Sequence, residues 1–114
     1  MISKTLVAAS TKPLVLTILK NGENYGYQII QIIRRISGGH LVWSEPMFYP
    51  LLQRMERDGL VKSKWIITDN KRLRKYYRLT EKGLLEQEKE KEQWFLISGI
   101  FSRLLESTFV SEGQ

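Results

Sequence analysis

The chain has 114 residues, the size of one domain, and 42% of them are hydrophobic, which is enough for a small core. It contains no cysteine, which excludes disulfides and thiolate sites and fits a cytoplasmic protein. No segment approaches the ~18 apolar residues of a membrane span, so we expect no membrane partner.

The net charge of +6 is concentrated in one segment. Residues 54–78 hold nine basic and three acidic residues, so this segment carries the whole net charge and the rest of the chain is balanced. A localised basic surface is typical of nucleic-acid-binding proteins, because lysine and arginine neutralise phosphates and release condensed counterions. The alternative is a solvated basic face that only keeps the protein soluble.

Two helices are predicted in the first third of the chain. Apolar residues at helical spacing predict a helix over 13–20, and the segment 2–9 is a candidate for a separate short helix ahead of Pro13. Asn24 is expected to cap a second helix, which ends at residues 37–39. Its predicted apolar stripe is Ile29, Ile32, Ile33 and Ile36.

A third helix is predicted from a cap at Ser44 to about residue 58. Tyr49, Gln53 and Arg57 are spaced by four, so they line one face, which we expect to be exposed. Pro50 removes a backbone donor, so the helix either starts late or has a distorted first turn. The predicted apolar stripe is Phe48, Leu51, Leu52 and Met55.

A β-hairpin follows the third helix. The β-branched and aromatic residues of segments 60–67 and 74–79 predict two strands, joined by a six-residue basic loop with an exposed tip. Trp65 and Tyr77 on these strands are expected to be packing residues.

Thr80 is expected to cap a long last helix. Residues 86–93 have no apolar side chain, which predicts a solvent-exposed connecting segment with Glu88–Lys91 and Glu86–Lys89 pairs. A wide apolar patch follows, which must fold back or dimerise, and we expect a dimer. Its predicted interface residues are Trp94, Ile97, Ile100, Phe101, Leu104 and Leu105. The residues after 106 are expected to fray.

Three helices, a hairpin and a helix, in this order, predict a mainly α (α+β) fold, a winged helix-turn-helix with a two-stranded β-wing. We expect a DNA-binding domain over residues 1–79 and a C-terminal dimerisation helix over 80–114. In this fold the third helix enters the major groove of DNA, and the wing reaches the adjacent backbone or minor groove.

Three motifs resemble the PadR family of bacterial transcriptional repressors. They are NYGYQII in the second helix, FYPLLQRMERDGLV in the third, and RKYYRLTEKG at the second strand and the start of the last helix. The resemblance spans about residues 13–105. It implies a homodimer that forms through the C-terminal helix and binds double-stranded DNA at a palindromic operator. The chain has Pro46, Met47 and Phe48 where the family usually has a small residue, threonine and leucine, and Leu73 where glycine or proline is common, so no operator sequence is implied.

One subgroup of the family, with a short, single C-terminal helix, includes a lactococcal multidrug-resistance regulator and binds flat aromatic drugs between paired tryptophans. Trp94 lies at the matching position, 14 residues beyond Thr80. The resemblance therefore implies a planar aromatic ligand that stacks on Trp94. The alternative is that Trp94 only packs the dimer seam.

Candidate DNA contacts come from the second helix, the third helix and the wing. Met47, Tyr49 and Gln53 are expected to face base edges, and the basic residues to neutralise phosphates or enter the minor groove. Two alternatives stay open: Arg54 and Arg57 pair with Glu56 or Asp58, and Tyr25 and Tyr27 belong to the half-buried core. The full set is Tyr25, Tyr27, Gln28, Ser44, Met47, Tyr49, Gln53, Arg54, Arg57, Lys71, Arg72, Arg74 and Lys75.

Enzymatic chemistry has no support in the sequence. His40 is the only histidine and has no carboxylate or serine motif beside it, and there is no metal-ligand cluster or phosphate-cradling glycine loop. We therefore expect no catalytic residue, metal or cofactor. The expected function is a dimeric, sequence-specific transcriptional repressor that a small aromatic ligand relieves. The alternative is a winged-helix adaptor that binds another protein without specific DNA binding.

Overall fold

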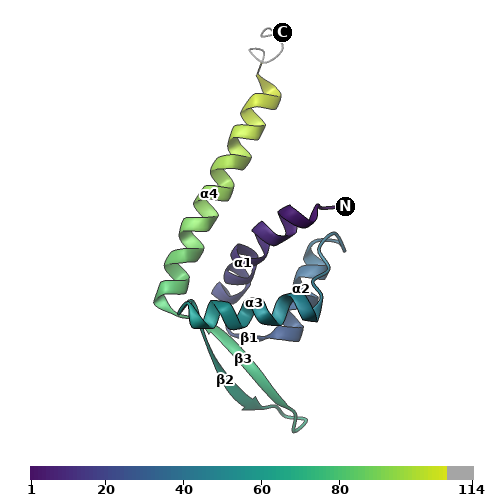
Figure 1. Cartoon of the computed structure of the whole chain (residues 1–114), viewed down its shortest axis with the longest axis vertical. Helices are drawn as coiled ribbons and strands as arrows, with labels where there is room; N and C mark the ends of the chain where they lie inside the picture. Colours follow the sequence, from purple (N-terminus) through teal and green to yellow (C-terminus); the bar gives the residue numbers. More distant parts are fainter. Residues whose placement is uncertain (108–114) are drawn as a thin grey trace.

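A computed structural model describes residues 1–107 and has the predicted fold, a winged helix-turn-helix with a long C-terminal helix (Figure 1). The elements are α1 (Lys4–Lys20), β1 (Asn24–Tyr25), α2 (Gly26–Ile36), α3 (Glu45–Arg57), β2 (Val61–Ile67), β3 (Leu73–Leu79) and α4 (Glu81–Glu106). The distal part of α4 runs away from the body and extends the molecule to 64 × 29 × 22 Å. Residues 108–114, which include most of the segment expected to fray, lie outside the described residues.

The first helix is longer than predicted. A single helix runs through Pro13, so there is no separate helix over residues 2–9. The Ser3 hydroxyl accepts a hydrogen bond from the Leu6 N–H at 3.2 Å and caps its start. The missing N–H of Pro13 would have bonded the carbonyl of the exposed residue Ala9, where water can substitute, and the Thr17 hydroxyl donates to the Pro13 carbonyl at 2.8 Å.

The start of α2 also differs from the prediction. Asn24 does not cap the helix. It lies in β1, a short strand that the sequence did not predict, and pairs with Tyr77 of β3. Tyr25 takes the cap position without a side-chain hydrogen bond. The buried face of α2 is Ile29, Ile30 and Ile33, whereas Ile36, expected in the stripe, is 72% exposed. The second helix is therefore rotated relative to the predicted stripe.

The third helix begins where it was predicted to begin. The Ser44 hydroxyl accepts from the Met47 N–H at 3.3 Å, and the Phe48 N–H donates to the Ser44 carbonyl at 2.9 Å, so the first turn is regular. Pro50 lies inside the helix, which neither starts late nor loses its first turn. The missing N–H of Pro50 would have bonded the carbonyl of the exposed residue Pro46, where water can substitute. Phe48, Leu52 and Met55 are buried, as predicted.

The three strands form one antiparallel sheet in the order β1-β3-β2. The hairpin register runs from Val61 opposite Leu79 to Ile67 opposite Leu73. Leu73 therefore belongs to the strand, and the loop has five residues rather than six. Within this loop the Lys71 N–H donates to the Thr68 carbonyl at 2.8 Å, and Lys71 adopts a positive φ of 62°. We call β2, the loop 68–72 and β3 the wing.

The start of α4 is held against the junction between α3 and β2. The Thr80 hydroxyl caps the helix by accepting from the Gly83 N–H at 3.0 Å. A Cβ on Gly83 would lie 2.0 Å from the Leu60 carbonyl oxygen, so only glycine allows this approach.

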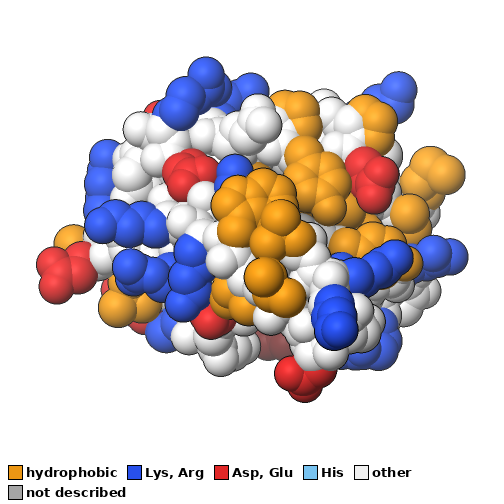
Figure 2. Space-filling view, turned by 90° about the horizontal axis from the view of Figure 1, so that it is seen from below, with side chains coloured by type: hydrophobic (Ala, Val, Ile, Leu, Met, Phe, Trp, Pro, Cys, Tyr) orange, Lys and Arg blue, Asp and Glu red, His pale blue; other side chains and the backbone are white. Residues whose placement is uncertain are grey.

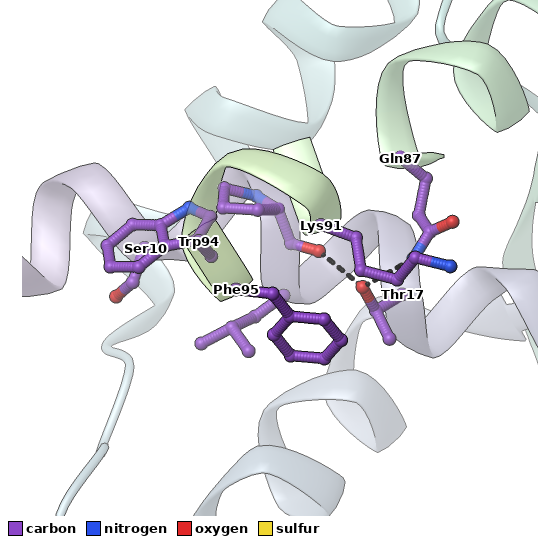
Figure 3. Close-up of a pocket in the computed structure, with 8 residues that line it drawn as sticks. Ser10, Thr17, Gln87, Lys91, Trp94 and Phe95 are labelled. Carbon is purple, nitrogen blue, oxygen red and sulfur yellow. Dashed lines mark hydrogen bonds between the residues drawn. The ribbon is translucent and has the colours of Figure 1, made fainter. Parts of the chain in front are cut away.

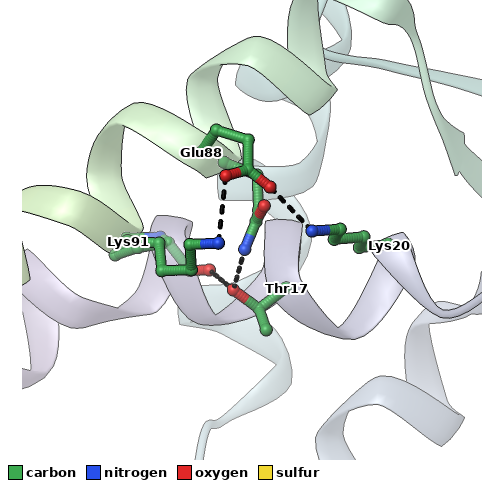
Figure 4. A network of polar contacts seen from close by, with 6 residues as sticks. Thr17, Lys20, Glu88 and Lys91 are labelled. Carbon is green, nitrogen blue, oxygen red and sulfur yellow. Dashed lines mark hydrogen bonds and ion pairs between the residues drawn. The ribbon is translucent and has the colours of Figure 1, made fainter. Parts of the chain in front are cut away.

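Residues 86–93 are not a solvent-exposed connector, which corrects the sequence analysis. Gln87 is only 2% exposed, and its amide donates to the Thr17 hydroxyl of α1 at 3.1 Å. The Glu88 carboxylate accepts from Lys20 at 2.7 Å and contacts Lys91, the predicted partner, at 3.0 Å (Figure 4). These two ammonium groups lower the pKa of Glu88 to about 2. We call this contact between α1 and α4 the polar seam.

The polar seam includes a second ion pair. The Lys12 ammonium lies 2.9 Å from Glu86 and 3.8 Å from Glu90, in place of the predicted pair of Glu86 with Lys89. The hydrogen bond from Lys12 lowers the pKa of Glu86. Because folding lowers the pKa values of Glu86 and Glu88, their contributions to stability are present above about pH 4.5 and are lost as the pH falls below it, down to about pH 2 for Glu88.

Thr17→Val should weaken the polar seam. The variant leaves the buried Gln87 amide without its acceptor, so we expect the free energy of unfolding to fall by about 1–3 kcal/mol. Thr17→Ser keeps the hydroxyl and should stay within ~0.5 kcal/mol of the original protein. Chemical denaturation at one protein concentration measures both values. Equal stability of the two variants would show that the hydrogen bond contributes nothing.

Candidate nucleic-acid interface

The third helix and the wing lie at the same end of the molecule. In Figure 1 the wing projects below α3, and the view from below shows lysine and arginine side chains around a central apolar cluster (Figure 2). We call the surface in this view the lower face. The basic residues expected to contact DNA come from α3 and the wing, the two elements at this end.

Several of these basic side chains have no acidic partner. Arg54, Arg57, Lys71 and Arg72 are exposed, and none of them makes an ion pair within residues 1–107. The alternative in which the two α3 arginines pair with Glu56 or Asp58 is therefore wrong. Uncompensated exposed cations attract phosphates.

The acidic neighbour on α3 is engaged elsewhere. Glu56 accepts hydrogen bonds from the Ser63 N–H at 3.2 Å and from its hydroxyl at 2.7 Å. It also lies 4.0 Å from Lys75. Glu56 thus ties the wing to α3 and does not neutralise Arg54 or Arg57.

The outer face of α3 carries the side chains expected to face bases. Gln53 and Arg57 are exposed, and Met47 is 38% exposed. Tyr49 is half-buried rather than exposed, because its ring packs edge-on against Phe48 with centroids 5.8 Å apart. Burial raises the pKa of the Tyr49 phenol, Glu45 adds to this and Arg74 opposes it. Tyr49 therefore stays protonated at neutral pH and can donate a hydrogen bond.

Tyr49 also touches the first residue of α2. A Cβ on Gly26 would lie 2.5 Å from a carbon of the Tyr49 ring. Glycine at this position therefore lets α2 and α3 approach closely and sets where the Tyr49 hydroxyl points. The sequence analysis did not identify this role of Gly26, because only the packing of the two helices reveals it.

The start of α2 places the other predicted contacts. Tyr27 is 50% exposed, whereas Tyr25 and Gln28 are half-buried. The Tyr25 ring packs edge-on against Tyr76 with centroids 5.3 Å apart, and the Arg74 guanidinium lies over it at 4.2 Å. Tyr25 therefore belongs in part to the half-buried core, as one alternative predicted, whereas Tyr27 faces solvent. Ser44 is exposed and caps α3.

The wing differs from the prediction in one aromatic residue. Tyr77 is buried, as expected, but Trp65 is 63% exposed, so its expected packing role is wrong. Both face the same side of the hairpin, but the outer half of the wing has no core above it. The Lys75 ammonium lies 5.9 Å from the Trp65 ring. The signal for exposure was the position of Trp65 near the tip of the hairpin.

The apolar patch on α4 does not fold back onto the body within the described residues. Exposed fractions are 54% for Ile97, 64% for Phe101 and 83% for Leu105. The other predicted interface residues, which are also exposed, are Trp94, Ile100 and Leu104.

A cavity of about 310 Å³ lies at the top of the polar seam. Trp94 and Phe95 of α4 and Leu14 of α1 line it, together with Gln87 (Figure 3). The Gln87 Oε1 atom is buried and has no hydrogen-bond partner. The cavity is therefore mainly apolar.

No helix in the described part of the chain is long and apolar enough to cross a membrane. Among the same residues, no group of three or more histidine, aspartate or glutamate side chains is placed to hold a metal ion.

Together, the three packed helices, the antiparallel sheet with its wing, and the unpaired cations define a DNA-binding protein of the winged helix-turn-helix class. Residues 15–89 match the model of the transcriptional regulator PadR-like family. The chain therefore belongs to the PadR-like family of transcriptional regulators, and it is a regulator rather than an enzyme.

Solved structures agree with this assignment. A transcriptional regulator from Clostridium thermocellum is 26% identical, with a TM-score of 0.81 over 93% of this chain and 100% of that chain. A PadR-like transcriptional regulator from Bacillus cereus is 28% identical, with a TM-score of 0.81 over 91% and 99%. A PadR family regulator from Clostridium difficile is 30% identical, with a TM-score of 0.75 over 84% and 98%.

Gly26→Ala should displace the Tyr49 ring. We expect the added methyl group to lower the free energy of unfolding by about 1–3 kcal/mol, because α2 and α3 have no room for it. In a Tyr49→Ala background the same change should have a much smaller effect, which a double-mutant cycle by denaturation measures. Additive effects of the two substitutions would contradict the contact.

Proposed function

We propose that the protein is a homodimeric repressor that binds a palindromic operator in double-stranded DNA. The observation that carries the proposal is the set of exposed cations without acidic partners on α3 and the wing tip: Arg54, Arg57, Lys71 and Arg72. The acidic residues of the polar seam pair with Lys12 and Lys20 on α1, so they do not neutralise this surface. Phosphates are the ligands that such a surface attracts.

In this proposal α3 enters the major groove. Met47, Tyr49 and Gln53 face base edges, where an amide and a phenol can read donors and acceptors and a thioether can contact a thymine methyl group. Arg54 and Arg57 neutralise phosphates beside the groove. The exposed cap of α3 at Ser44 and the start of α2, with Tyr25, Tyr27 and Gln28, approach the backbone, because helix N-termini favour anions.

The wing contributes the remaining contacts. Lys71 and Arg72 at its tip are exposed, so they can reach phosphates or the minor groove of the adjacent DNA. Arg74 and Lys75 lie on β3 and are half-buried, and each already contacts an aromatic ring. We expect them to neutralise phosphates nearer the body.

The exposed apolar face of α4 supports a dimer. Ile97, Phe101 and Leu104 lie at helical spacing and are all more than half exposed, which is unfavourable in water unless another surface covers them. A second copy with the same face gives a symmetric interface, and two symmetric reading helices need two symmetric half-sites. The unit 1–79 would bind DNA and the unit 80–114 would dimerise, although the polar seam joins the first turns of α4 to the body.

The cavity at Trp94 supports a small-molecule effector. Its lining is mostly apolar and includes two aromatic rings, which suits a planar aromatic ligand. A ligand at this position would lie between α1 and the dimer helix, where it could change the angle between the two reading helices and relieve repression.

Arg72→Ala should weaken binding to every DNA sequence. The test is fluorescence anisotropy of a labelled duplex from the region upstream of the gene, against scrambled duplex, over a salt series. The original protein should bind selectively with a steep negative salt slope, and the variant should reduce the magnitude of that slope by about one. Arg35→Ala, an exposed arginine near the end of α2, is the matched control and should change nothing.

An unchanged salt slope for Arg72→Ala would contradict the proposed contact between Arg72 and a phosphate. Absence of salt-dependent binding by the original protein to any duplex would contradict the repressor proposal and favour a protein-binding adaptor.

Trp94→Ala should weaken the binding of planar aromatic molecules while the dimer persists. We expect affinity for an acridine dye to fall at least about tenfold, because the stacking surface is lost. Trp65→Ala, which changes a tryptophan far along the chain on the wing, should leave dye affinity unchanged. Dye fluorescence measures binding, and sedimentation measures the dimer. Dissociation into monomers with no other change would mean that Trp94 only packs in the dimer interface.

A further inference from the structure

The lower face contains a cleft between α3 and the wing. Its volume is about 460 Å³, and its lining includes Tyr49 and Gln53 on α3 and Trp65, Leu73 and Lys75 on the wing. Two of its walls therefore come from α3 and the wing, and a third comes from β1 and the start of α2, where Tyr25, Gly26 and Tyr27 line it. The wing side of the cleft is partly apolar, and neither the basic residues of the wing nor the family motifs explain why.

The outer half of the wing is apolar on the side that faces this cleft. Trp65 pairs with Lys75, and Ile67 pairs with Leu73, so these four side chains share one face of the hairpin. Trp65 is 63% exposed, Ile67 72% and Leu73 61%. The central apolar cluster of the lower face, bordered by lysine and arginine, is visible in Figure 2. Contiguous exposed apolar surface of this kind marks a binding site.

The charges around the cleft select an anionic occupant. Lys75 and Arg74 line it, and the exposed Lys71 and Arg72 lie in the adjoining loop. Of the acidic groups on this side, Glu56 is bound to Ser63, Glu45 affects the Tyr49 phenol, and Asp69 lies in the same loop as the two cations, which outnumber it. A ligand for this cleft therefore needs an apolar surface next to negative charge. The backbone of DNA has both, because deoxyribose carbons alternate with phosphates.

We propose that this cleft holds one sugar–phosphate strand of the operator, with the Trp65 ring and Leu73 against deoxyribose and with Lys75 and Arg74 on the flanking phosphates. The inference rests on the proposed function, since it assumes that α3 and the wing bind the same duplex. It adds Trp65 and Leu73 as DNA contacts that release no counterions.

A second copy of the chain is a weaker occupant. The exposed apolar face suited to a copy is on the distal part of α4, at the opposite end of the molecule from the wing (Figure 1). Two copies meeting at the wing would also bring Lys71, Arg72 and Lys75 of each close together, which like-charge repulsion disfavours.

The proposal separates two parts of the binding energy. Replacing a cation of the interface by a neutral residue removes a phosphate contact, so the dependence of DNA affinity on salt concentration changes. Replacing a tryptophan of the interface by a smaller residue removes only buried apolar area, so DNA affinity falls by the same factor at every salt concentration.

The experiment compares Trp65→Ala with Lys75→Gln on the duplex that the original protein binds best. Trp65→Ala should weaken binding about tenfold at every salt concentration, with the slope unchanged, and Trp65→Phe should recover most of this loss. Lys75→Gln should weaken binding and reduce the slope by about one. Ile36→Ala, which removes an equally exposed apolar side chain from the end of α2, is the control and should change neither quantity.

Trp65→Lys provides a second variant at the same position. A lysine there would meet phosphate, so the magnitude of the slope should rise by about one. Unfolding curves should be the same for all variants of the exposed Trp65.

Unchanged affinity of both Trp65→Ala and Trp65→Lys would overturn the cleft assignment and leave the proposed function intact, provided that the original protein still binds its operator. A lower dimer affinity of Trp65→Ala, with DNA affinity per dimer unchanged, would also overturn it and assign the cleft to a second copy. Failure of the original protein to bind any duplex would contradict the proposed function itself.

Discussion

The hydrogen bond from the buried Gln87 amide to Thr17 joins α4 to α1, and the geometry of the whole molecule depends on the seam around it. The Lys12–Glu86 and Lys20–Glu88 pairs lie on the same two helices. The seam sets the angle between the helix that carries the exposed apolar face and the body that carries α3. In a dimer, that angle determines the separation of the two reading helices, and the match to half-site spacing depends on it.

The distribution of acidic residues matters as much as that of the basic ones. Glu86 and Glu88 pair with lysines at the seam, and Glu56 holds Ser63 of the wing. Each of these carboxylates is held by a partner other than the exposed arginines. The surface formed by α3 and the wing therefore keeps its positive charge, while the chain as a whole has 12 acidic residues among 114.

Sequence patterns predicted those features that depend on neighbours along the chain. Ser44 and Thr80 cap their helices as expected, and Phe48, Leu52 and Met55 form the expected buried stripe. Residues 86–93 were wrongly predicted to be exposed to solvent, because a hydrophobic pattern depends on apolar side chains and does not detect a buried amide. Asn24 was assigned wrongly because its partner, Tyr77, is distant in the sequence. The candidate DNA contacts stay a prediction. They lie on β1, α2, α3 and the wing, with Ser44 as the cap of α3, and the pattern alone did not indicate which of them contact other side chains.

By itself, the sequence determined the order of the helices and the hairpin and the concentration of charge in residues 54–78, because periodicity, capping and composition are local properties. The PadR-like family followed from the resemblance of three short motifs. Only the tertiary structure decided that Gln87 is buried, that Gly26 and Gly83 are places of close approach, and that Trp65 faces a cleft beside α3. Each of these depends on two segments far apart in the chain that meet at a particular distance. Packing sets that distance, and no local pattern encodes it.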